Sequence, residues 1–492
     1  MESRLPAITR PINVQRIPHL VAVLALTSSA VFASDGTPDP TFAQGASVLF
    51  PNYAYLSASV GDHSARGIVI GDDQRLTVVG DFQRDSALAN RDCGLLRTLP
   101  DADLYDGTFL PPFGYGDIAF DRGGSNTDLC FGIALRDDQG IMVVGSATVD
   151  AEDRREGLVF QTLADGSFDP AFFGDGTFET AIDGPPELIA SDVEFRHVVR
   201  DDAGFVVSGA AQVPILGGGS LSLGVALRFN GDGSLDEQFG DGGPALLLGG
   251  DAAGLLELRG MARASDGSLW FAGDRSGSGV GDGGRLFRLL PDRTLDPDVG
   301  GSNGQFLPQC AFVSSIAIDP SSRVLLGCDP GDAMSLAGVL RLIPGPGGWL
   351  PDAAFGNAGF APIRIRPEDT PGIGPRLSGA VTIVLQPTGR IIVAGTYVNE
   401  RFNRNPSDAV VARMDDHGTL DASFGFAGAA RFGFGSGIDL TRDTANALAL
   451  DAEARPVLVG ASYSSASMTR SYVVARLQQL PDGMFIDGFE SL

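Results

Sequence analysis

The chain has 492 residues, enough for about three domains of roughly 150 residues each. Hydrophobic residues make up 43% of it, which is ample for a large core and argues against disorder. The 61 acidic residues outnumber 35 basic ones, all arginine, so the net charge is −26. This charge argues against nucleic-acid partners, and the lack of lysine excludes a P-loop lysine, a Schiff-base enzyme and a lysine general base.

Residues 1–33 have the features of a secretory signal peptide. Three arginines precede a short apolar run at residues 20–26, which is too short to span a bilayer. Residues 31–33 fit a small-x-small cleavage site before Ser34. An uncleaved N-terminal anchor is the alternative. We therefore expect an exported protein that is secreted or at the cell surface, with the periplasm as the other compartment to consider.

A short strand that ends in glycine recurs along the rest of the chain. Successive glycines of this kind lie between 54 and 68 residues apart. They are Gly80, Gly145, Gly209, Gly273, Gly327, Gly395 and Gly460. A fixed period of this kind is the signature of a repeat architecture.

Each repeat contains four predicted strands. A first strand precedes the glycine-ended one across a short turn such as residues 137–140, so the two are predicted to form a hairpin. A third strand, such as residues 224–228, follows after a loop of variable length. A turn block, clearest at residues 232–240, then leads to a short fourth strand such as residues 244–248.

Four strands in each of seven units predict an all-β fold, a seven-bladed β-propeller of four-stranded blades. We expect one propeller domain over residues 34–483, with repeats of about 65 residues, and a short C-terminal tail at residues 484–492. A β-solenoid is the alternative, but its coils usually repeat at under about 30 residues. The first turn block lies at residues 35–42, so the strand at residues 47–50 is expected to complete the last blade and remove an open sheet edge.

The turn block and its period resemble the delta-60 repeat, a predicted β-propeller repeat of secreted bacterial proteins. The resemblance lies in the glycine-ended strand, an Ala-Arg-Leu strand and the block Asp-Gly-x-Leu-Asp-x-x-Phe-Gly, and it covers nearly all of residues 35–483. Two blocks depart from it: Leu110 replaces Asp in the block that runs to Phe113, and Val299 replaces Phe in another. The resemblance implies an exported propeller, with no established reaction, ligand or catalytic residue. The tail at residues 484–490 is also similar to a C-terminal ending of exported proteins in some Gram-negative bacteria.

An arginine on the third strand and an aspartate and a phenylalanine in the turn block recur from unit to unit. The arginines are Arg97, Arg228, Arg288, Arg341, Arg413 and Arg476, with Gln161 in the remaining place. The aspartates are Asp39, Asp169, Asp236, Asp296, Asp352 and Asp421, and the phenylalanines are Phe42, Phe113, Phe172, Phe239, Phe355 and Phe424. We expect Arg–Asp pairs or side-chain caps of the turns, and phenylalanine packing between blades. Whether each arginine pairs with the next aspartate is left open, because Gln161 precedes Asp169.

Calcium is the one cofactor that the sequence suggests. Asp101, Asp103 and Asp106 place three carboxylates beside a glycine turn, and calcium takes six to eight oxygen ligands. Residues 230–236 offer oxygens at alternate positions, although they also form the repeated turn block. Neither segment fits an EF-hand loop, and acidic surface turns are the alternative. No catalytic or other cofactor-binding residue is indicated.

Five variable loops follow glycine-ended strands and are expected to gather on one face of the ring, where function often resides. They are residues 81–92, 149–156, 210–221, 274–284 and 397–408. The last loop mixes arginine, asparagine and aromatic residues. Tyr397, Arg401, Phe402 and Arg404 are therefore candidate contacts for a sugar or a peptide, with a solvated loop as the alternative.

The four cysteines, Cys93, Cys130, Cys310 and Cys328, suit an exported protein and allow three pairings. Cys310 and Cys328 flank one apparent hairpin, which favours that pair and leaves Cys93 with Cys130. No Cys-x-x-Cys occurs, so neither a redox motif nor a zinc ribbon is supported. Free buried thiols are the alternative.

These observations favour a binding or interaction module for a protein or glycan partner at the loop face. Whether the protein catalyses a reaction is left open. A hydrolase or lyase that acts on polysaccharide through carboxylates at the central channel is one alternative, and a structural protein of the cell envelope is another. No transmembrane segment is expected once the signal peptide is removed.

Overall fold

The computed structural model describes residues 35–39, 41–45, 48–50, 63–83, 90–151, 153–180, 192–214, 220–240, 243–249, 255–277, 282–331, 336–365, 376–398, 407–433, 441–464 and 469–479. Residues 34–492 form one compact unit, to which every described residue belongs. None of the helices in these ranges has the length and apolar character needed to span a bilayer.

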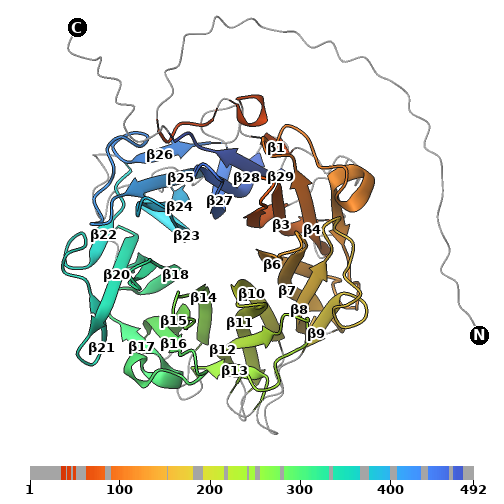
Figure 1. The fold of residues 1–492 in the computed structure, drawn as a ribbon, viewed down its shortest axis with the longest axis horizontal. Helices are drawn as coiled ribbons and strands as arrows, with labels where there is room; N and C mark the ends of the chain where they lie inside the picture. Colours follow the sequence, from red (N-terminus) through yellow and green to blue (C-terminus); the bar gives the residue numbers. More distant parts are fainter. Residues whose placement is uncertain are drawn as a thin grey trace, which may run out of the picture. The chain divides into compact units, whose positions relative to one another are not determined.

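The described residues form short antiparallel strands in repeated groups (Figure 1). The innermost strands of the groups are β2 (Ser64–Ile70), β6 (Asp128–Leu135), β10 (Asp192–Asp201), β14 (Leu255–Arg263), β18 (Phe312–Ile318), β23 (Arg376–Leu385) and β27 (Thr441–Leu450). The second strands contain the recurring glycines: β3 (Leu76–Gln83), β7 (Ile141–Thr148), β11 (Gly204–Pro214), β15 (Leu269–Ser276), β19 (Val324–Asp329), β24 (Ile391–Val398) and β28 (Pro456–Ser464).

The third strands are β4 (Arg91–Thr98), β8 (Arg155–Thr162), β12 (Ser220–Phe229), β16 (Gly283–Leu289), β20 (Gly338–Gly345), β25 (Ser407–Met414) and β29 (Thr469–Arg476). The outer strands are β5 (Tyr115–Ile118), β9 (Thr177–Thr180), β13 (Ala245–Leu248), β17 (Gln305–Leu307), β22 (Phe360–Pro362), β26 (Ala429–Phe432) and β1 (Val48–Phe50). The remaining elements are β21 (Gly348–Pro351) and the short helical turns η1 (Phe42–Gly45), η2 (Leu110–Gly114), η3 (Pro297–Val299) and η4 (Gly301–Asn303).

Among the described residues, the strands pair into five sheets. Two of these sheets contain two groups each, joined by single parallel pairs between β12 and β14 and between β25 and β27. At the chain's beginning, β1 pairs antiparallel with β29 through Val48 and Val474. The N-terminal strand therefore completes the sheet formed by the end of the propeller sequence, as expected.

The innermost strands surround a common centre (Figure 1). Each innermost strand contacts the next one in the order β2, β6, β10, β14, β18, β23 and β27, and β27 contacts β2. Between neighbouring sheets the space is filled by apolar side chains; for example, Val144 and Val159 share one buried cluster with Phe195 and Val207. The prediction of an all-β, propeller-like fold is confirmed.

Each recurring glycine faces an irregular point in the innermost strand. Gly145 pairs with Cys130 and Gly209 with Phe195, and the next residue of the inner strand drops out of register as a β-bulge. A Cβ atom on either glycine would lie 1.8 Å from a backbone carbonyl oxygen of the inner strand. Only glycine permits so close a backbone approach, so the repeated glycine marks a repeated bulge.

The recurring arginine and aspartate hold the turn block together, as predicted. Asp352 accepts a 3.0 Å hydrogen bond from the Ala354 N–H and a 2.9 Å bond from Nε of Arg341, whose guanidinium lies 4.3 Å from the Phe355 ring centroid. Equivalent Arg–Asp pairs join Arg228 to Asp236, Arg288 to Asp296, Arg413 to Asp421 and Arg476 to Asp39. The pairing that the sequence left open therefore exists in these blocks.

The first complete block differs from the prediction. Its aspartate is Asp106, which accepts a hydrogen bond from the Thr108 N–H, and its phenylalanine is Phe109, which is 0% exposed beneath the Arg97 guanidinium. The assignment of Leu110 and Phe113 to these places was wrong, and Phe113 is 48% exposed. The segment before Asp106 is one residue longer than the block that leads to Asp169, which displaces the pattern.

Both expected disulfides are present. Cys93 on β4 bonds Cys130 on β6, and Cys310 bonds Cys328 on β19, with Cα–Cα distances of 5.2 and 5.4 Å. The first bond joins two neighbouring sheets, whereas the second lies within one hairpin region.

Candidate functional site

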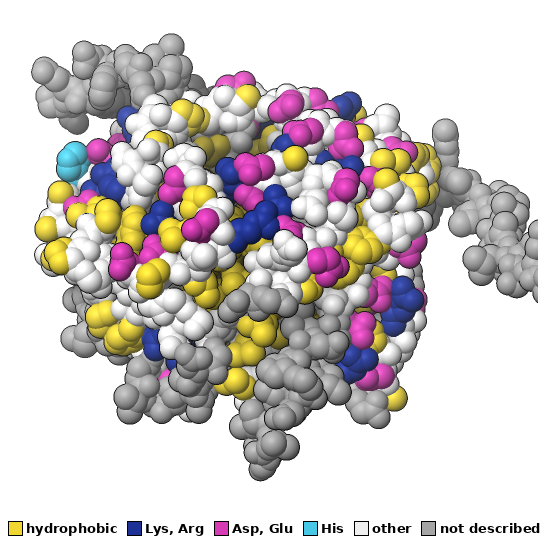
Figure 2. Space-filling view, turned by 60° about the horizontal axis from the view of Figure 1, so that its bottom comes forward, with side chains coloured by type: hydrophobic (Ala, Val, Ile, Leu, Met, Phe, Trp, Pro, Cys, Tyr) yellow, Lys and Arg dark blue, Asp and Glu magenta, His cyan; other side chains and the backbone are white. Residues whose placement is uncertain are grey.

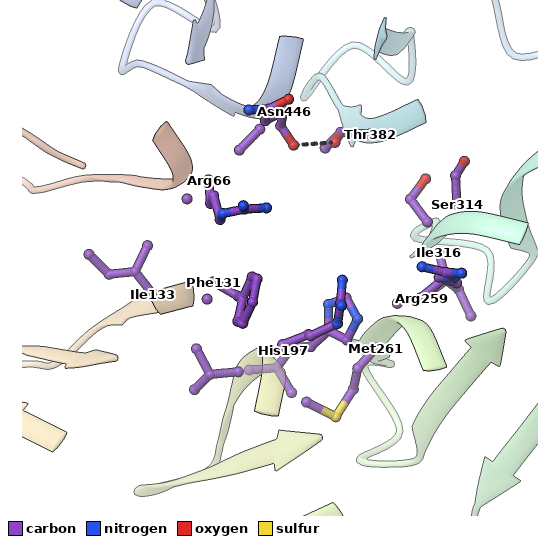
Figure 3. A pocket seen from close by; sticks show the side chains of 18 of the residues that line it. Arg66, Phe131, Ile133, His197, Arg259, Met261, Ser314, Ile316, Thr382 and Asn446 are labelled. Carbon is purple, nitrogen blue, oxygen red and sulfur yellow. Dashed lines mark hydrogen bonds between the residues drawn. The ribbon is translucent and has the colours of Figure 1, made fainter. Parts of the chain in front are cut away.

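A pocket of about 410 Å³ lies where the innermost strands meet. The bulge residues line it: Arg66, Phe131, Arg196, Arg259, Ser314 and Asn446 (all but Arg196 are labelled in Figure 3). Because a bulge turns an extra side chain out of the regular alternation, the same irregularity in successive strands directs different side chains into one space. The pocket is thus a product of the repeat, lined by residues that do not repeat.

The pocket lies at the same end of the strands as the variable loops. Ala65 pairs with Gly80 and Ser64 with Asp81, so Arg66 lies near the start of β2 and near the end of β3. The chain leaves β3 at this end to enter the loop that follows it. Gly209 and Arg196 have the same relation in β11 and β10. The expected loop face and the pocket therefore share one end of the ring.

Three arginines give the pocket its basic character. Arg66, Arg196 and Arg259 project from β2, β10 and β14, with side chains 34%, 39% and 36% exposed. Each one contacts a carboxylate: Arg66 pairs with Asp81, Arg196 with Glu194 at 2.5 Å, and Arg259 with Glu257 and, at 3.4 Å, Asp274. A guanidinium has five N–H donors in a fixed plane, so a carboxylate on one edge orients the group and leaves other donors for a ligand.

Phe131 brings two of these arginines together. The guanidinium carbons of Arg66 and Arg196 lie 5.0 and 4.9 Å from the centroid of its ring. Attraction between a cation and the π face offsets part of the repulsion between the two cations. We infer that Phe131 positions Arg66 and Arg196, because both guanidinium groups lie against its ring.

His197 follows the bulge residue Arg196 and also lines the pocket. Its Nε2 lies 3.2 Å from the carbonyl oxygen of Leu258, and because a carbonyl only accepts, Nε2 carries the proton and Nδ1 has the lone pair. Burial, with a smaller effect from the charges of Arg196 and Arg259, lowers the pKa of His197 to about 4, although the bond to the Leu258 carbonyl opposes the shift. The ring is therefore neutral at pH 7.

Asn446 on β27 and Thr382 on β23 form hydrogen bonds at the edge of the pocket. Asn446 donates to the carbonyl oxygen of Ala65 at 2.7 Å and to Oγ of Ser64 at 3.1 Å. Thr382 donates to the backbone carbonyl of Asn446 at 3.4 Å (Figure 3). These bonds join β23, β27 and β2 at the edge of the pocket.

The described residues that line the pocket include no Asp or Glu. Asp81, Glu194, Glu257 and Asp274 contact the pocket arginines but are not among the residues that line the pocket. Figure 2 shows a similar intermixing of acidic and basic side chains on the face that it presents. The arginines of these ion pairs therefore line the pocket, whereas their carboxylate partners do not.

The three predicted calcium ligands occupy different surroundings. Asp101 accepts a 2.9 Å bond from Arg476, Asp106 accepts bonds from Thr108, and Asp103 is exposed. In the described ranges, two other groups have three possible ligand atoms within 4.8 Å of one another: Asp92 with Asp121 and Asp128, and Asp415 with Asp416 and His417. Calcium at Asp101, Asp103 and Asp106 stays a prediction.

The predicted binding loop, residues 397–408, is described only at its two ends, residues 397–398 and 407–408. Tyr397 is 1% exposed, and the guanidinium of Arg431 lies 4.6 Å from the centroid of its ring. Arg401, Phe402 and Arg404 lie outside the described residues. A role of this loop in binding stays a prediction.

Sequence reasoning missed the pocket arginines. A signal for them exists, because each bulge residue lies 13 or 14 positions before a recurring glycine, as Arg66 does before Gly80 and Arg196 before Gly209. Residues at this position differ from unit to unit, whereas those directly beside it are small or apolar, except for His197. A variable polar position inside a constant strand is the pattern expected of a shared binding site.

Residues 386–424 match the family described as "Domain of unknown function (DUF5122) beta-propeller". No curated protein matches the chain. Among solved structures, the chain is similar to a polysaccharide lyase, a PL25 ulvan lyase, at 10% identity and a TM-score of 0.43, over 91% of this chain and 97% of that one. It is also similar to an endo-arabinase from Bacteroides thetaiotaomicron (10% identity, TM-score 0.31, 72% and 94% covered) and a fungal alcohol oxidase (13%, 0.39, 88% and 76%). The family match supports a β-propeller repeat at residues 386–424.

Proposed function

We propose that the protein is an exported seven-bladed β-propeller that binds an acidic glycan in its central pocket. Each innermost strand begins a four-stranded group, and β1 supplies the outer strand of the last one. The features of residues 1–33 and the two disulfides support export, because disulfides persist in oxidising compartments. Seven blades, export and a secreted or cell-surface location belong to this proposal.

The observation that carries the glycan proposal is the set of Arg66, Arg196 and Arg259 around one pocket. The planar fork of a guanidinium matches carboxylate and sulfate groups, and it binds them through paired hydrogen bonds. Ser314 and Asn446 lie in the same pocket and offer a hydroxyl group and an amide oxygen, which can bind sugar hydroxyls. A uronic acid or a sulfated sugar combines these two kinds of group.

The size of the pocket favours a small unit of a glycan over the surface of a folded protein. Its volume of about 410 Å³ is within the range of small-molecule sites, whereas a stable protein interface buries about 800 Å² on each partner. The net charge of −26 repels polyanions at long range. Salt screens such repulsion beyond about 8 Å at physiological ionic strength, so contacts within the pocket decide binding.

Binding without turnover is favoured by the state of His197. A general base works best with a pKa near the operating pH, and the pKa of His197 lies near 4. The carboxylates that contact two of the pocket arginines, Asp81 and Glu194, are held in ion pairs. A polysaccharide hydrolase or lyase and a structural envelope protein remain the alternatives, and they differ in whether a glycan binds and whether it is cleaved.

The test is a calorimetric titration of residues 34–492 with oligosaccharides matched in length. The set contains a uronic-acid, a sulfated and a neutral oligosaccharide, and each mixture is assayed for new reducing ends and for unsaturated products. The proposal predicts binding of an acidic oligosaccharide, weaker or absent binding of the neutral one, and no cleavage. Cleavage would favour the enzyme alternative, and the lack of binding to every member would contradict the proposal.

A further inference from the structure

A second cluster of polar groups lies away from the pocket, beside the first disulfide. Asp92 is on β4, Asp121 is in the segment between β5 and β6, and Asp128 begins β6. One carboxylate oxygen of each lies within 4.8 Å of the others. None of the three belongs to a turn block or lines the pocket.

Asp128 has an unusual environment for a carboxylate. It is 0% exposed, and its Oδ2 accepts hydrogen bonds from the Phe120 N–H at 2.6 Å and the Asp121 N–H at 3.3 Å. Its Oδ1 is buried and has no hydrogen-bond partner among the described residues. A buried carboxylate oxygen without a donor carries a large desolvation cost, and a bound cation is one of the few groups that offset it.

The scaffold holds these carboxylates in place without help from a ligand. Cys93 follows Asp92 directly, Cys130 lies two residues after Asp128, and their disulfide joins the two strands. The bonds from Phe120 and Asp121 to Asp128 fasten the connecting segment to the start of β6. A site on β-strands that is fixed in this way is preorganised for a ligand.

The donor set suits a hard divalent cation. Calcium–oxygen distances are 2.3–2.6 Å, so two oxygens that share one calcium ion are at most about 5 Å apart, and the cluster meets this limit. Asn90 lies two residues before Asp92, just before β4 begins, and its buried Oδ1 has no hydrogen-bond partner in the described ranges. Asp121 is exposed, which leaves room for water ligands.

We propose that Asp92, Asp121 and Asp128 bind a calcium ion, with Asn90 as a further oxygen donor. The ion would join β4 to β6 at the contact between two neighbouring sheets, next to the disulfide that already links them. Calcium accepts an irregular set of six to eight oxygens, whereas magnesium requires a near-ideal octahedron and retains its waters. This site is separate from the pocket and does not depend on the proposed function.

The test is the thermal unfolding of residues 34–492 in EDTA, in calcium and in magnesium, together with equilibrium dialysis against radioactive calcium. We expect about one calcium ion per chain and a midpoint that rises with calcium concentration, because a ligand of the native state stabilises it by mass action. Asp128→Asn should abolish the rise. Asp103→Asn is the matched control, since Asp103 is exposed and outside the cluster, and it should retain the full rise.

Asp121→Asn protects the test against misfolding of the buried variant. Asp121 is exposed, so this variant should fold, and its affinity for calcium should fall at least tenfold. The proposal is overturned if the wild type binds no calcium, if magnesium stabilises it equally, or if the rise survives in both Asp128→Asn and Asp121→Asn. Loss of the rise in Asp103→Asn alone would instead place calcium at the turn of residues 101–106.

Discussion

The bulge beside each recurring glycine makes a strong prediction for Gly209→Ala. The new Cβ would lie 1.8 Å from the carbonyl oxygen of Glu194 and 2.8 Å from Cα of Phe195. Both obstacles are backbone atoms, which cannot move aside as a flexible side chain does. The strands β10 and β11 must therefore separate next to the bulge that carries Arg196.

The cost follows from the atoms that must move. Ordinary contact requires the Cβ and the oxygen to lie about 1.5 Å further apart, and overpacking of this kind costs about 1–3 kcal/mol. The shift also weakens one or two strand hydrogen bonds at about 1 kcal/mol each. Alanine restricts the unfolded chain and returns about 0.4–1 kcal/mol. We expect Gly209→Ala to lower the free energy of unfolding by about 3 kcal/mol.

Gly243→Ala is the matched control, because a Cβ there would meet no atom within 4 Å. Its stability should stay within about 1 kcal/mol of the wild type. Urea unfolding followed by circular dichroism and by tryptophan fluorescence measures both variants, since Trp270 and Trp349 are buried in one cluster. If Gly209→Ala is no less stable than Gly243→Ala, the bulge does not explain the repeated glycine.

Three further predictions concern stability. Burial raises the pKa of Asp352, but the bonds from Ala354 and Arg341 outweigh it and the net pKa lies below 3.8. The contribution of Asp352 to stability is therefore present above pH 3.8 and lost as the pH falls further. Asp352→Asn leaves the Arg341 charge buried, so it should lower the free energy of unfolding by about 3 kcal/mol, measured by urea unfolding at pH 7. The control variant Asp292→Asn, at an exposed residue, should lower it far less. The pKa of His197 falls from 6.5 to about 4 on folding, so between these pH values the unfolded chain binds more protons than the folded one. The free energy of unfolding should therefore drop as the pH is lowered from about 7 to 5. His197→Gln should make this pH dependence weaker. Cys93→Ser with Cys130→Ser opens a bond between residues 37 apart, so it should cost about 4 kcal/mol in the loop-entropy estimate, and an unchanged urea midpoint would contradict this.

The fold was accessible to sequence reasoning because its supports repeat. Gly209, Arg341 and Asp352 each have counterparts at a fixed period, so their structural role is visible without coordinates. The sequence comparison did not assign Asp106 to the turn block because one extra residue precedes it and displaces the pattern. A single insertion hides a motif from pattern matching, while the chain absorbs it in an exposed turn.

The candidate sites were less accessible, because the residues that form them do not repeat. Arg66, Arg196 and Arg259 share a position in the bulge, but Phe131 and Ser314 occupy the same position in other strands. In the sequence, the residue at this position differs from one repeat to the next, so it does not form a recognisable motif. Only the ring of inner strands shows that these different side chains meet.

The acidic cluster was hidden for a different reason. Asp92 and Asp128 are 36 residues apart, and no spacing rule for metal ligands relates them. The pairing of Cys93 with Cys130 was expected, and it implies that their neighbours lie close together. The burial of Asp128, which makes the cluster unusual, depends on the packing of β4 against β6.

The central claim is that the pocket arginines bind an acidic glycan. The most direct measurement is a calorimetric titration of the best acidic oligosaccharide into the wild type, Arg196→Ala and Arg122→Ala. Arg122 pairs with Glu179 at 2.9 Å on an exposed part of the surface, so its variant removes the same charge and a similar ion pair outside the pocket. The account predicts that Arg196→Ala weakens binding at least tenfold, as expected for a charged hydrogen bond worth about 1.5–3 kcal/mol, while Arg122→Ala binds like the wild type. Equal affinity in all three proteins would contradict it.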